Sequence, residues 1–213
     1  MLKKSLLVLI TLLFNLSISN AQDFSFGIKG GGSLVKMKFE NLNSDYETNY
    51  GFSFGIMEVY RSNQLLSLEA DLLYSQKGTK YLIEQIYHTT YTLEYLSLPI
   101  LAKLYLPEIS FLKTHLDLGP SFNYLISYQK EIQVQYDPNK TYLFYYPSPI
   151  DYNKNLNSFD MGLIAGLGFD CQLFSHTISL DTRYEIGLTD INKDLGNGSI
   201  KNRTFSLFLG YLF

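Results

Sequence analysis

Two neighbouring segments, 158–173 and 177–189, alternate polar or small residues with apolar ones almost without a break. Successive side chains of a β-strand point to opposite faces, so each segment has one apolar face and one polar or small face. The two segments are separated by a short connection near Phe174 and Ser175. The pattern therefore predicts an antiparallel hairpin whose two faces differ in chemistry.

The composition of the polar face indicates which side of this hairpin points inward. A strand face in water usually carries Lys, Glu and Thr, whereas this face combines several glycines with isolated charges such as Asp170, Asp181 and Arg183. Such a mixture is typical of side chains that crowd inside a narrow closed barrel. We therefore expect the apolar face to contact lipid and the polar face to fill the lumen.

The same alternation recurs along the chain and predicts an all-β fold, an eight-stranded antiparallel up-and-down transmembrane β-barrel. The predicted strands cover about 24–35, 50–60, 65–78, 91–106, 114–129, 158–173, 177–189 and 202–213. From the N-terminus, the connections are alternately long and short, which matches the long extracellular loops and short periplasmic turns of bacterial outer-membrane barrels. Both termini are then expected in the periplasm.

Three parts of the chain depart from this regular pattern. Pro99 stands in the middle of the fourth predicted strand, where it predicts a bulge or a local break in pairing. Residues 79–90 are predicted to form a loop, although their apolar content also suggests strands that extend beyond the membrane. Residues 130–157 are the longest stretch without periodicity. Strand boundaries in these regions stay open.

The first 21 residues resemble a secretory signal peptide. Lys3 and Lys4 form a basic start, residues 6–14 form an apolar run, and small residues precede Gln22. A membrane anchor is the alternative, but the run is shorter than the roughly 20 residues that a spanning helix needs. We expect cleavage after residue 21, export to the outer membrane of a Gram-negative cell, and a barrel domain over 22–213.

The overall composition agrees with a membrane barrel. Charged residues make up 17% of the chain, below the roughly 25% of a typical soluble protein, and Phe and Tyr together reach 15%. Removing the two lysines of the signal changes the formal charge from −3 to −5, so no nucleic-acid partner is expected. Cys171 is the single cysteine and by parity faces lipid.

The inward face of the predicted strands collects ten charged side chains. An eight-stranded barrel is only wide enough inside to be filled by its own side chains, and buried charges must be paired. We therefore expect a polar network that plugs the lumen. The alternative is a narrow ion path or a small polar-ligand site, which the excess of carboxylates favours for cations. The ten residues are Lys29, Glu69, Asp71, Lys103, Asp117, Asp160, Asp170, Asp181, Arg183 and Glu185.

Four tyrosines in the long non-periodic stretch form the candidate contact surface, namely Tyr142, Tyr145, Tyr146 and Tyr152. Tyrosine is favoured at interfaces, so this surface predicts a protein or glycan partner outside the cell. The alternative is that these residues only extend the sheet or pack on one another.

Catalysis is not expected. His115, with Asp117 and Ser121 on the same strand face, is the only candidate set for a nucleophile with its base and orienting acid. Such residues recur by chance on one face, and their geometry is not visible in the sequence. The chain also lacks metal-ligand spacing, a phosphate loop and a nucleotide motif, so no cofactor or metal is expected.

Short motifs spread over the whole mature chain carry a family resemblance. They include Gly27 to Gly31 (GIKGG), residues 95–104 (YLSLPILAKL), residues 119–122 (GPSF), residues 160–168 (DMGLIAGLG), residues 183–188 (RYEIGL) and the closing residues 209–213 (LGYLF). The chain thereby resembles the small outer-membrane barrels of Bacteroidetes called PorT-like, or "outer membrane protein beta-barrel domain". The resemblance implies barrel architecture, and most members have no assigned activity. The namesake is associated with protease export, which extends to this chain only by analogy of fold.

The sequence thus predicts a monomeric outer-membrane barrel in contact with lipid, with a structural or interaction role through its extracellular loops and a link to protein secretion suggested by the resemblance. Two other classes of protein stay open. One is a secreted soluble barrel with reversed faces that binds an apolar ligand, and the other is an outer-membrane lipid hydrolase that depends on His115.

Overall fold

A computed structural model describes residues 24–39, 46–83, 87–107, 112–137, 140–147, 156–191 and 199–213 of the chain. No helix able to cross a membrane is present within these ranges. The regular elements are the strands β1 (Phe24–Phe39), β2 (Tyr46–Arg61), β3 (Leu66–Ile83), β4 (Tyr87–Tyr105), β5 (Leu112–Asp137), β6 (Lys140–Pro147), β7 (Phe159–Leu173), β8 (His176–Gly187) and β9 (Ile200–Leu212).

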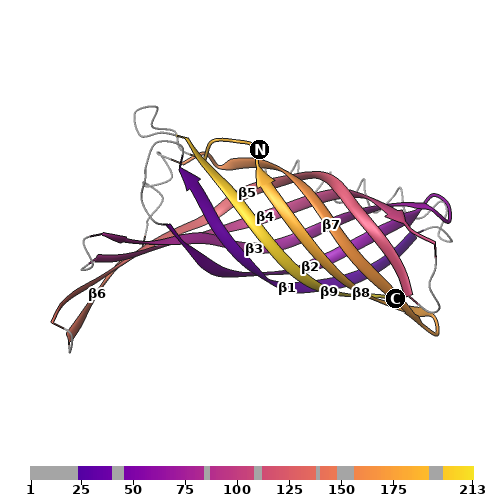
Figure 1. Cartoon of the computed structure of the whole chain (residues 1–213), viewed down its shortest axis with the longest axis horizontal. Coiled ribbons are helices and arrows are strands. Elements are labelled where there is room, and N and C mark those ends of the chain that lie inside the picture. The colour runs from indigo at the N-terminus through magenta and orange to yellow at the C-terminus, as the bar shows by residue number, and fades with distance from the viewer. Residues whose placement is uncertain are drawn as a thin grey trace.

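Eight of these strands close into a barrel (Figure 1). Each strand pairs antiparallel with its neighbours in the order β4-β3-β2-β1-β9-β8-β7-β5, and a further pairing of β4 with β5 completes the ring. Within the described ranges, β6 pairs with β5 alone and is not part of the ring. The predicted eight-stranded up-and-down barrel is confirmed, with β6 as a ninth strand that the sequence pattern did not predict.

The two faces of the hairpin formed by β7 and β8 are oriented as expected. The side chains of Phe159 and Leu180 are 47% and 44% exposed on the outer face, whereas those of Asp170 and Arg183 are 5% and 3% exposed in the lumen. A lipid-facing exterior explains exposed apolar residues and a buried polar interior together. The alternative of a soluble barrel with reversed faces is therefore wrong.

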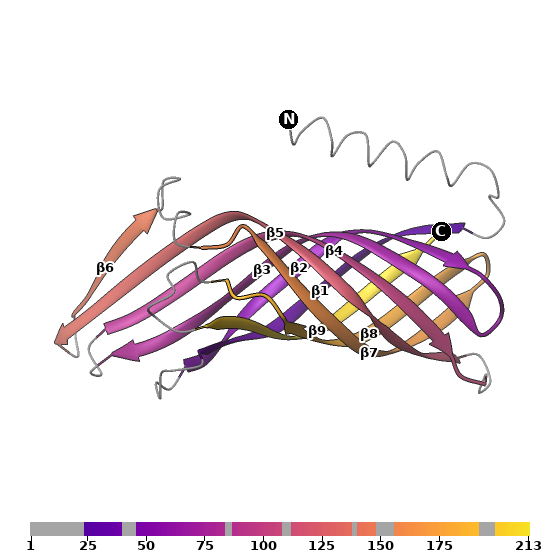
Figure 2. The same ribbon diagram turned by 90° about the horizontal axis from the view of Figure 1, so that it is seen from above.

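β3, β4 and β5 extend past the other strands at one end of the barrel, where β6 also lies (Figures 1 and 2). β3 and β4 stay paired up to Ile83 and Tyr87, so residues 79–83 and 87–90 are strand and the predicted loop is wrong there. β5 continues to Asp137 and pairs with β6 from Gln129 onward. This end carries the two longest connections between barrel strands, from β5 to β7 and from β8 to β9, and is therefore extracellular by the general rule for such barrels.

The opposite, periplasmic end has connections of two to six residues. Only Phe174 and Ser175 separate β7 from β8, and Phe174 has a φ of 57°, the only positive φ of a non-glycine residue in the described ranges. The last residues of β9 reach the same end, where Leu212 pairs with Gly27 and Thr177.

The irregularity predicted at Pro99 takes a mild form. The pairs Ala70–Ile100 and Leu73–Ser97 keep one register on either side of it, with two pairs missing between them. The register shift of β4 lies instead at Glu94 and Tyr95, opposite an extra residue of β5. Proline therefore interrupts the ladder without shifting it, because it removes one donor and inserts no residue.

Two predictions fall outside the described residues. The expected signal peptide at 1–21 lies there, and so does Tyr152.

Candidate functional site

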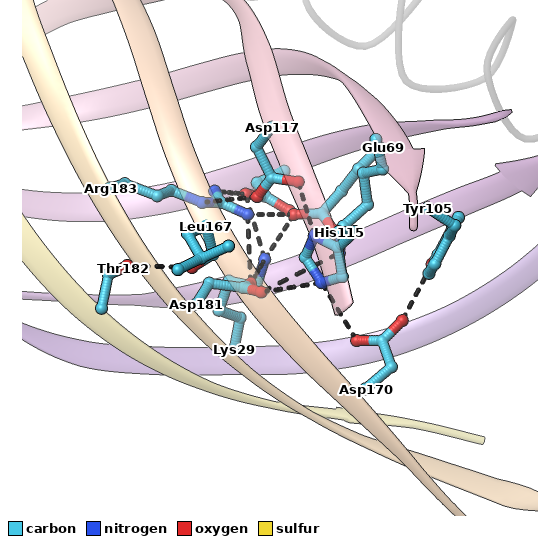
Figure 3. Close-up of polar contacts among 12 residues, drawn as sticks. Lys29, Glu69, Tyr105, His115, Asp117, Leu167, Asp170, Asp181, Thr182 and Arg183 are labelled. Carbon is cyan, nitrogen blue, oxygen red and sulfur yellow. Dashed lines mark hydrogen bonds and ion pairs between the residues drawn. The ribbon is translucent and has the colours of Figure 1, made fainter. Parts of the chain in front are cut away.

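Glu69 on β3 forms the centre of a buried ionic cluster in the lumen (Figure 3). Its carboxylate accepts hydrogen bonds from Lys29 of β1, from Lys103 of β4 at 2.6 Å, and from Arg183 of β8. These strands place the three cations around the ring because each residue has the inward parity of its strand. One carboxylate therefore links four strands.

Arg183 extends the cluster to further carboxylates. Its Nη1 donates to Asp71 Oδ2 at 2.7 Å, its Nη2 lies 3.3 Å from Asp181 Oδ2, and its Nε lies 3.8 Å from Asp117 Oδ2. Lys29 Nζ adds a 2.9 Å contact to Asp181 Oδ2. Charges removed from water in this way are stabilised only by such dense pairing.

His115 of β5 joins two more carboxylates to the cluster. Its Nδ1 lies 2.8 Å from Asp117 Oδ1, and its Nε2 lies 3.3 Å from Asp170 Oδ1 and 3.4 Å from Asp181 Oδ1. Figure 3 shows the imidazole ring of His115 directed toward Asp170 and Asp181. The other oxygen of Asp170 accepts a 2.8 Å hydrogen bond from the Tyr105 hydroxyl.

A second polar group lies nearer the extracellular end of the lumen. Glu185 Oε2 pairs with Lys77 Nζ at 2.7 Å, and its Oε1 accepts from Ser121 at 2.6 Å and from Asn123 at 2.9 Å. Asp160 accepts a 2.8 Å hydrogen bond from Asn202. Of the ten predicted lumen residues, eight meet in the first cluster, while Glu185 and Asp160 lie in the second.

Several members were missing from the predicted set. Lys77, Tyr105, His115 and Asn202 take part in the contacts above. Lys77, Tyr105 and His115 are an even number of residues from a predicted member on the same strand, and Asn202 is three residues from outward-facing Phe205 on β9. Parity was therefore the available signal, and the set of ten did not use it fully.

Apolar side chains border the polar lumen at both ends. Leu93, Tyr95, Leu125 and Ile191 form a buried cluster at the extracellular end, which we call the outer lid. Met57, Val59 and Leu212 form a smaller one toward the periplasm. Between the two polar groups, a cavity of about 30 Å³ has room for only a water molecule or two.

A larger depression, the periplasmic vestibule, lies at the other end of the lumen. It measures about 340 Å³ and is lined by the turn between β2 and β3 together with inward residues of β4, β5, β7 and β8, among them Tyr105, Lys113 and Asp170. The first cluster is therefore approached from the periplasmic side, with Asp170 on the wall of the vestibule.

The candidate catalytic set is not assembled. His115 contacts Asp117, but Ser121 is six residues further along β5, roughly 20 Å away at the rise of a strand. The Ser121 hydroxyl donates instead to Glu185. A base must lie within hydrogen-bond reach of its nucleophile, so His115 and Ser121 cannot act together.

The candidate contact surface is placed only by its backbone. Tyr142, Tyr145 and Tyr146 lie in β6, opposite Val134, Glu131 and Lys130 of β5. These three residues thus extend the sheet outside the barrel. Their backbone position is compatible with a contact surface and with a simple extension of the sheet.

Solved structures of outer-membrane barrels are similar to this chain. They include neisserial surface protein A at 15% identity and a TM-score of 0.48, covering 87% of this chain and 95% of that one. Outer membrane protein W of Escherichia coli has 15% identity and a TM-score of 0.45, with 90% and 98% covered. The attachment invasion locus protein Ail of Yersinia pestis has 13% identity and a TM-score of 0.43, with 90% and 99% covered.

No curated protein sequence matches the chain significantly. The family described as "Outer membrane protein beta-barrel domain" matches residues 20–193, which cover most of the strands of the barrel. Its description agrees with the lipid-facing exterior and the polar lumen found above. The chain therefore belongs to the outer membrane protein beta-barrel domain family and is a small β-barrel of the outer membrane.

Proposed function

We propose that this barrel is a monomeric, non-enzymatic scaffold that presents the hairpin of β5 and β6 to a protein partner outside the cell. The observation that carries the proposal is the position of β6. Among the residues that the structure describes, β6 pairs with β5 on one side only, and its other edge then offers backbone donors and acceptors. Such an edge can accept an added strand from a partner.

The lumen supports a structural rather than a conducting role. The first cluster joins side chains from β1, β3, β4, β5, β7 and β8 across the interior, and the cavity above it has room for only a water molecule or two. An ion crossing the barrel would have to separate several of these buried pairs. We therefore infer that the network stiffens the barrel and blocks conduction.

The partner class follows from the kind of contact. A free strand edge recognises polypeptide backbone, so it favours a protein over a glycan. Tyr142, Tyr145 and Tyr146 of the candidate contact surface belong to β6 itself, and tyrosine is favoured at interfaces. The resemblance to PorT-like barrels supports a component of protein secretion as the partner, and that support rests on the motifs alone.

Site-directed photo-crosslinking in intact cells tests this proposal. A photoreactive residue at Tyr145 in β6 is expected to capture a defined protein, whereas the same residue at lipid-facing Phe205 in β9 is not. In a second experiment, the photoreactive residue is placed at Glu131 of β5. Replacing Lys140–Pro147 by a Gly-Ser segment of equal length should then abolish the capture. Replacing residues 192–198, which connect β8 to β9 in the sequence, should not.

Capture that persists without β6, or none from the parent chain, would overturn the interaction role. The role of the lumen is tested separately in planar bilayers, where the purified barrel is expected to show no discrete conductance steps. Regular steps at low voltage would contradict a plugged lumen.

A further inference from the structure

We propose that His115, Asp170 and Asp181 form a binding site for one divalent transition-metal ion, Zn²⁺ by preference, reached from the periplasm. His115 Nε2 lies 3.3 Å from Asp170 Oδ1 and 3.4 Å from Asp181 Oδ1, and all three atoms lie within 4.8 Å of one another. In a tetrahedral zinc site with bonds of about 2.0–2.2 Å, neighbouring ligand atoms are roughly 3.3–3.5 Å apart.

Apart from their contacts with one another, these three atoms have no hydrogen-bond partner in the described part of the chain, although their residues are buried. His115 and Asp181 are 0% exposed and Asp170 is 5% exposed, yet His115 Nε2, Asp170 Oδ1 and Asp181 Oδ1 are all unsatisfied. An unpaired buried polar atom costs about 1–3 kcal/mol, so three that converge on one point need a common partner. A metal ion at that point satisfies all three together.

The remaining polar atoms of the three ligands are already held in place. Asp117 Oδ1 lies 2.8 Å from His115 Nδ1, which directs the lone pair of Nε2 toward the two carboxylates. The Tyr105 hydroxyl donates to Asp170 Oδ2, and Lys29 lies 2.9 Å from Asp181 Oδ2. A carboxylate that orients a ligating histidine, with hydrogen-bonded carboxylate ligands beside it, is the usual outer shell of a zinc site.

Charge balance in the first cluster favours a dication. Five carboxylates, from Glu69, Asp71, Asp117, Asp170 and Asp181, surround three cations, Lys29, Lys103 and Arg183. Two negative charges therefore stay uncompensated while His115 is neutral, and a dication would balance them. Lys103 would repel a bound cation, because its Nζ lies 4.0 Å from Asp181 Oδ1. It is held 2.6 Å from Glu69.

Space and access are provided by Gly168 and by the periplasmic vestibule. A Cβ added to Gly168 would lie 2.6 Å from His115 Nε2 and would also collide with Asp181 Oδ1, so glycine keeps this side of the site open. Asp170 lines both the site and the vestibule. Arg61 and Lys113 also line the vestibule, so we expect Zn²⁺ uptake to be slow and faster in high salt.

Metal analysis of the full mature barrel, folded in detergent, tests this site. The protein is treated with a chelator, incubated to equilibrium with Zn²⁺ alone, and freed of excess metal before its zinc content is measured. We expect one tightly bound Zn²⁺ per chain, and visible absorption bands of tetrahedral Co²⁺ when Co²⁺ replaces it. His115→Gln and Asp170→Asn should both lose this ion.

Asp160→Asn is the matched control, because Asp160 is also a buried lumen carboxylate of β7 with an unsatisfied Oδ1. It should keep the ion, as should His176→Ala, which removes a histidine at the periplasmic turn. Folding of each variant is checked by far-ultraviolet circular dichroism. Absence of zinc from the folded parent, zinc retained by folded Asp170→Asn, or zinc lost on His176→Ala would overturn the proposal.

Discussion

The guanidinium of Arg183 on β8 donates a 2.7 Å hydrogen bond to Asp71 on β3, 112 residues away in the sequence. β3 and β8 do not pair, since three other strands separate them in the ring. The contact therefore crosses the lumen and ties opposite walls together. Arg183 also contacts Glu69, Asp117 and Asp181, so it is the cation with the most carboxylate partners in the described network.

Replacing Arg183 by methionine is expected to destabilise the barrel strongly. Removing one partner leaves buried carboxylates without compensation, which costs about 3–5 kcal/mol of unfolding free energy. Urea unfolding in detergent or lipid, followed by tyrosine fluorescence, measures the change. Arg203→Met on the outer face of β9 is the control, expected within about 0.5 kcal/mol of the parent. Equal losses in both variants would contradict a special role for the lumen contact.

The lipid-facing band predicts a depth-dependent penalty for charge. Leu180 lies in β8 between Phe169 and Leu209, both exposed and apolar on the outer face. Leu180→Lys should lower the unfolding free energy by about 2–4 kcal/mol, the cost of lysine near the bilayer midplane. Leu188→Lys, beyond the extracellular end of β8, should cost about 0–1 kcal/mol. Urea unfolding from lipid vesicles measures both variants. Similar costs at the two positions would argue against a bilayer around β8.

The tight periplasmic turn stores strain that glycine should relieve. Phe174 has a φ of 57° and its side chain is 99% exposed, so it gains no packing to offset the steric cost. Phe174→Gly is expected to stabilise the barrel by about 1 kcal/mol, which is the cost of the left-handed region for a residue with a Cβ. Ser175→Gly, where φ is not positive, should give no gain in the same unfolding assay.

Asp117 is expected to act on the proposed metal site as a positioning residue. Asp117→Asn keeps the shape of the side chain but replaces the carboxylate that faces His115 Nδ1. Zn²⁺ affinity should fall about 10–100-fold, while the stoichiometry stays at one ion when Zn²⁺ is saturating. Competition with a chromophoric chelator measures the affinity. Unchanged affinity would show that the orientation of His115 does not depend on Asp117.

The strand pattern and the direction of the two faces were predictable because they depend on one property, the period of two. Asp170 and Arg183 differ from Phe159 and Leu180 by parity alone, and the closed ring then assigns inside and outside. The pattern did not reveal β6 or the bulge at Glu94 and Tyr95. Both depend on which residues pair across strands, and alternation within one strand carries no such information.

The convergence of His115 with Asp170 and Asp181 was not predictable for a related reason. The three residues come from β5, β7 and β8, and their spacing along the chain matches no metal motif. Only the register of neighbouring strands, such as the pairing of His115 with Gly168 and of Gly168 with Asp181, brings them to one level of the lumen. The alternation within β5 instead grouped His115 with Ser121, which lies six residues further along the same strand.

The outer lid has a consequence for the direction in which solutes can approach the interior. Leu93, Tyr95, Leu125 and Ile191 pack together at the extracellular end of the lumen, while the vestibule lies at the periplasmic end and shares Asp170 with the ionic cluster. Solutes of the periplasm therefore have a more direct route to this cluster than solutes of the external medium.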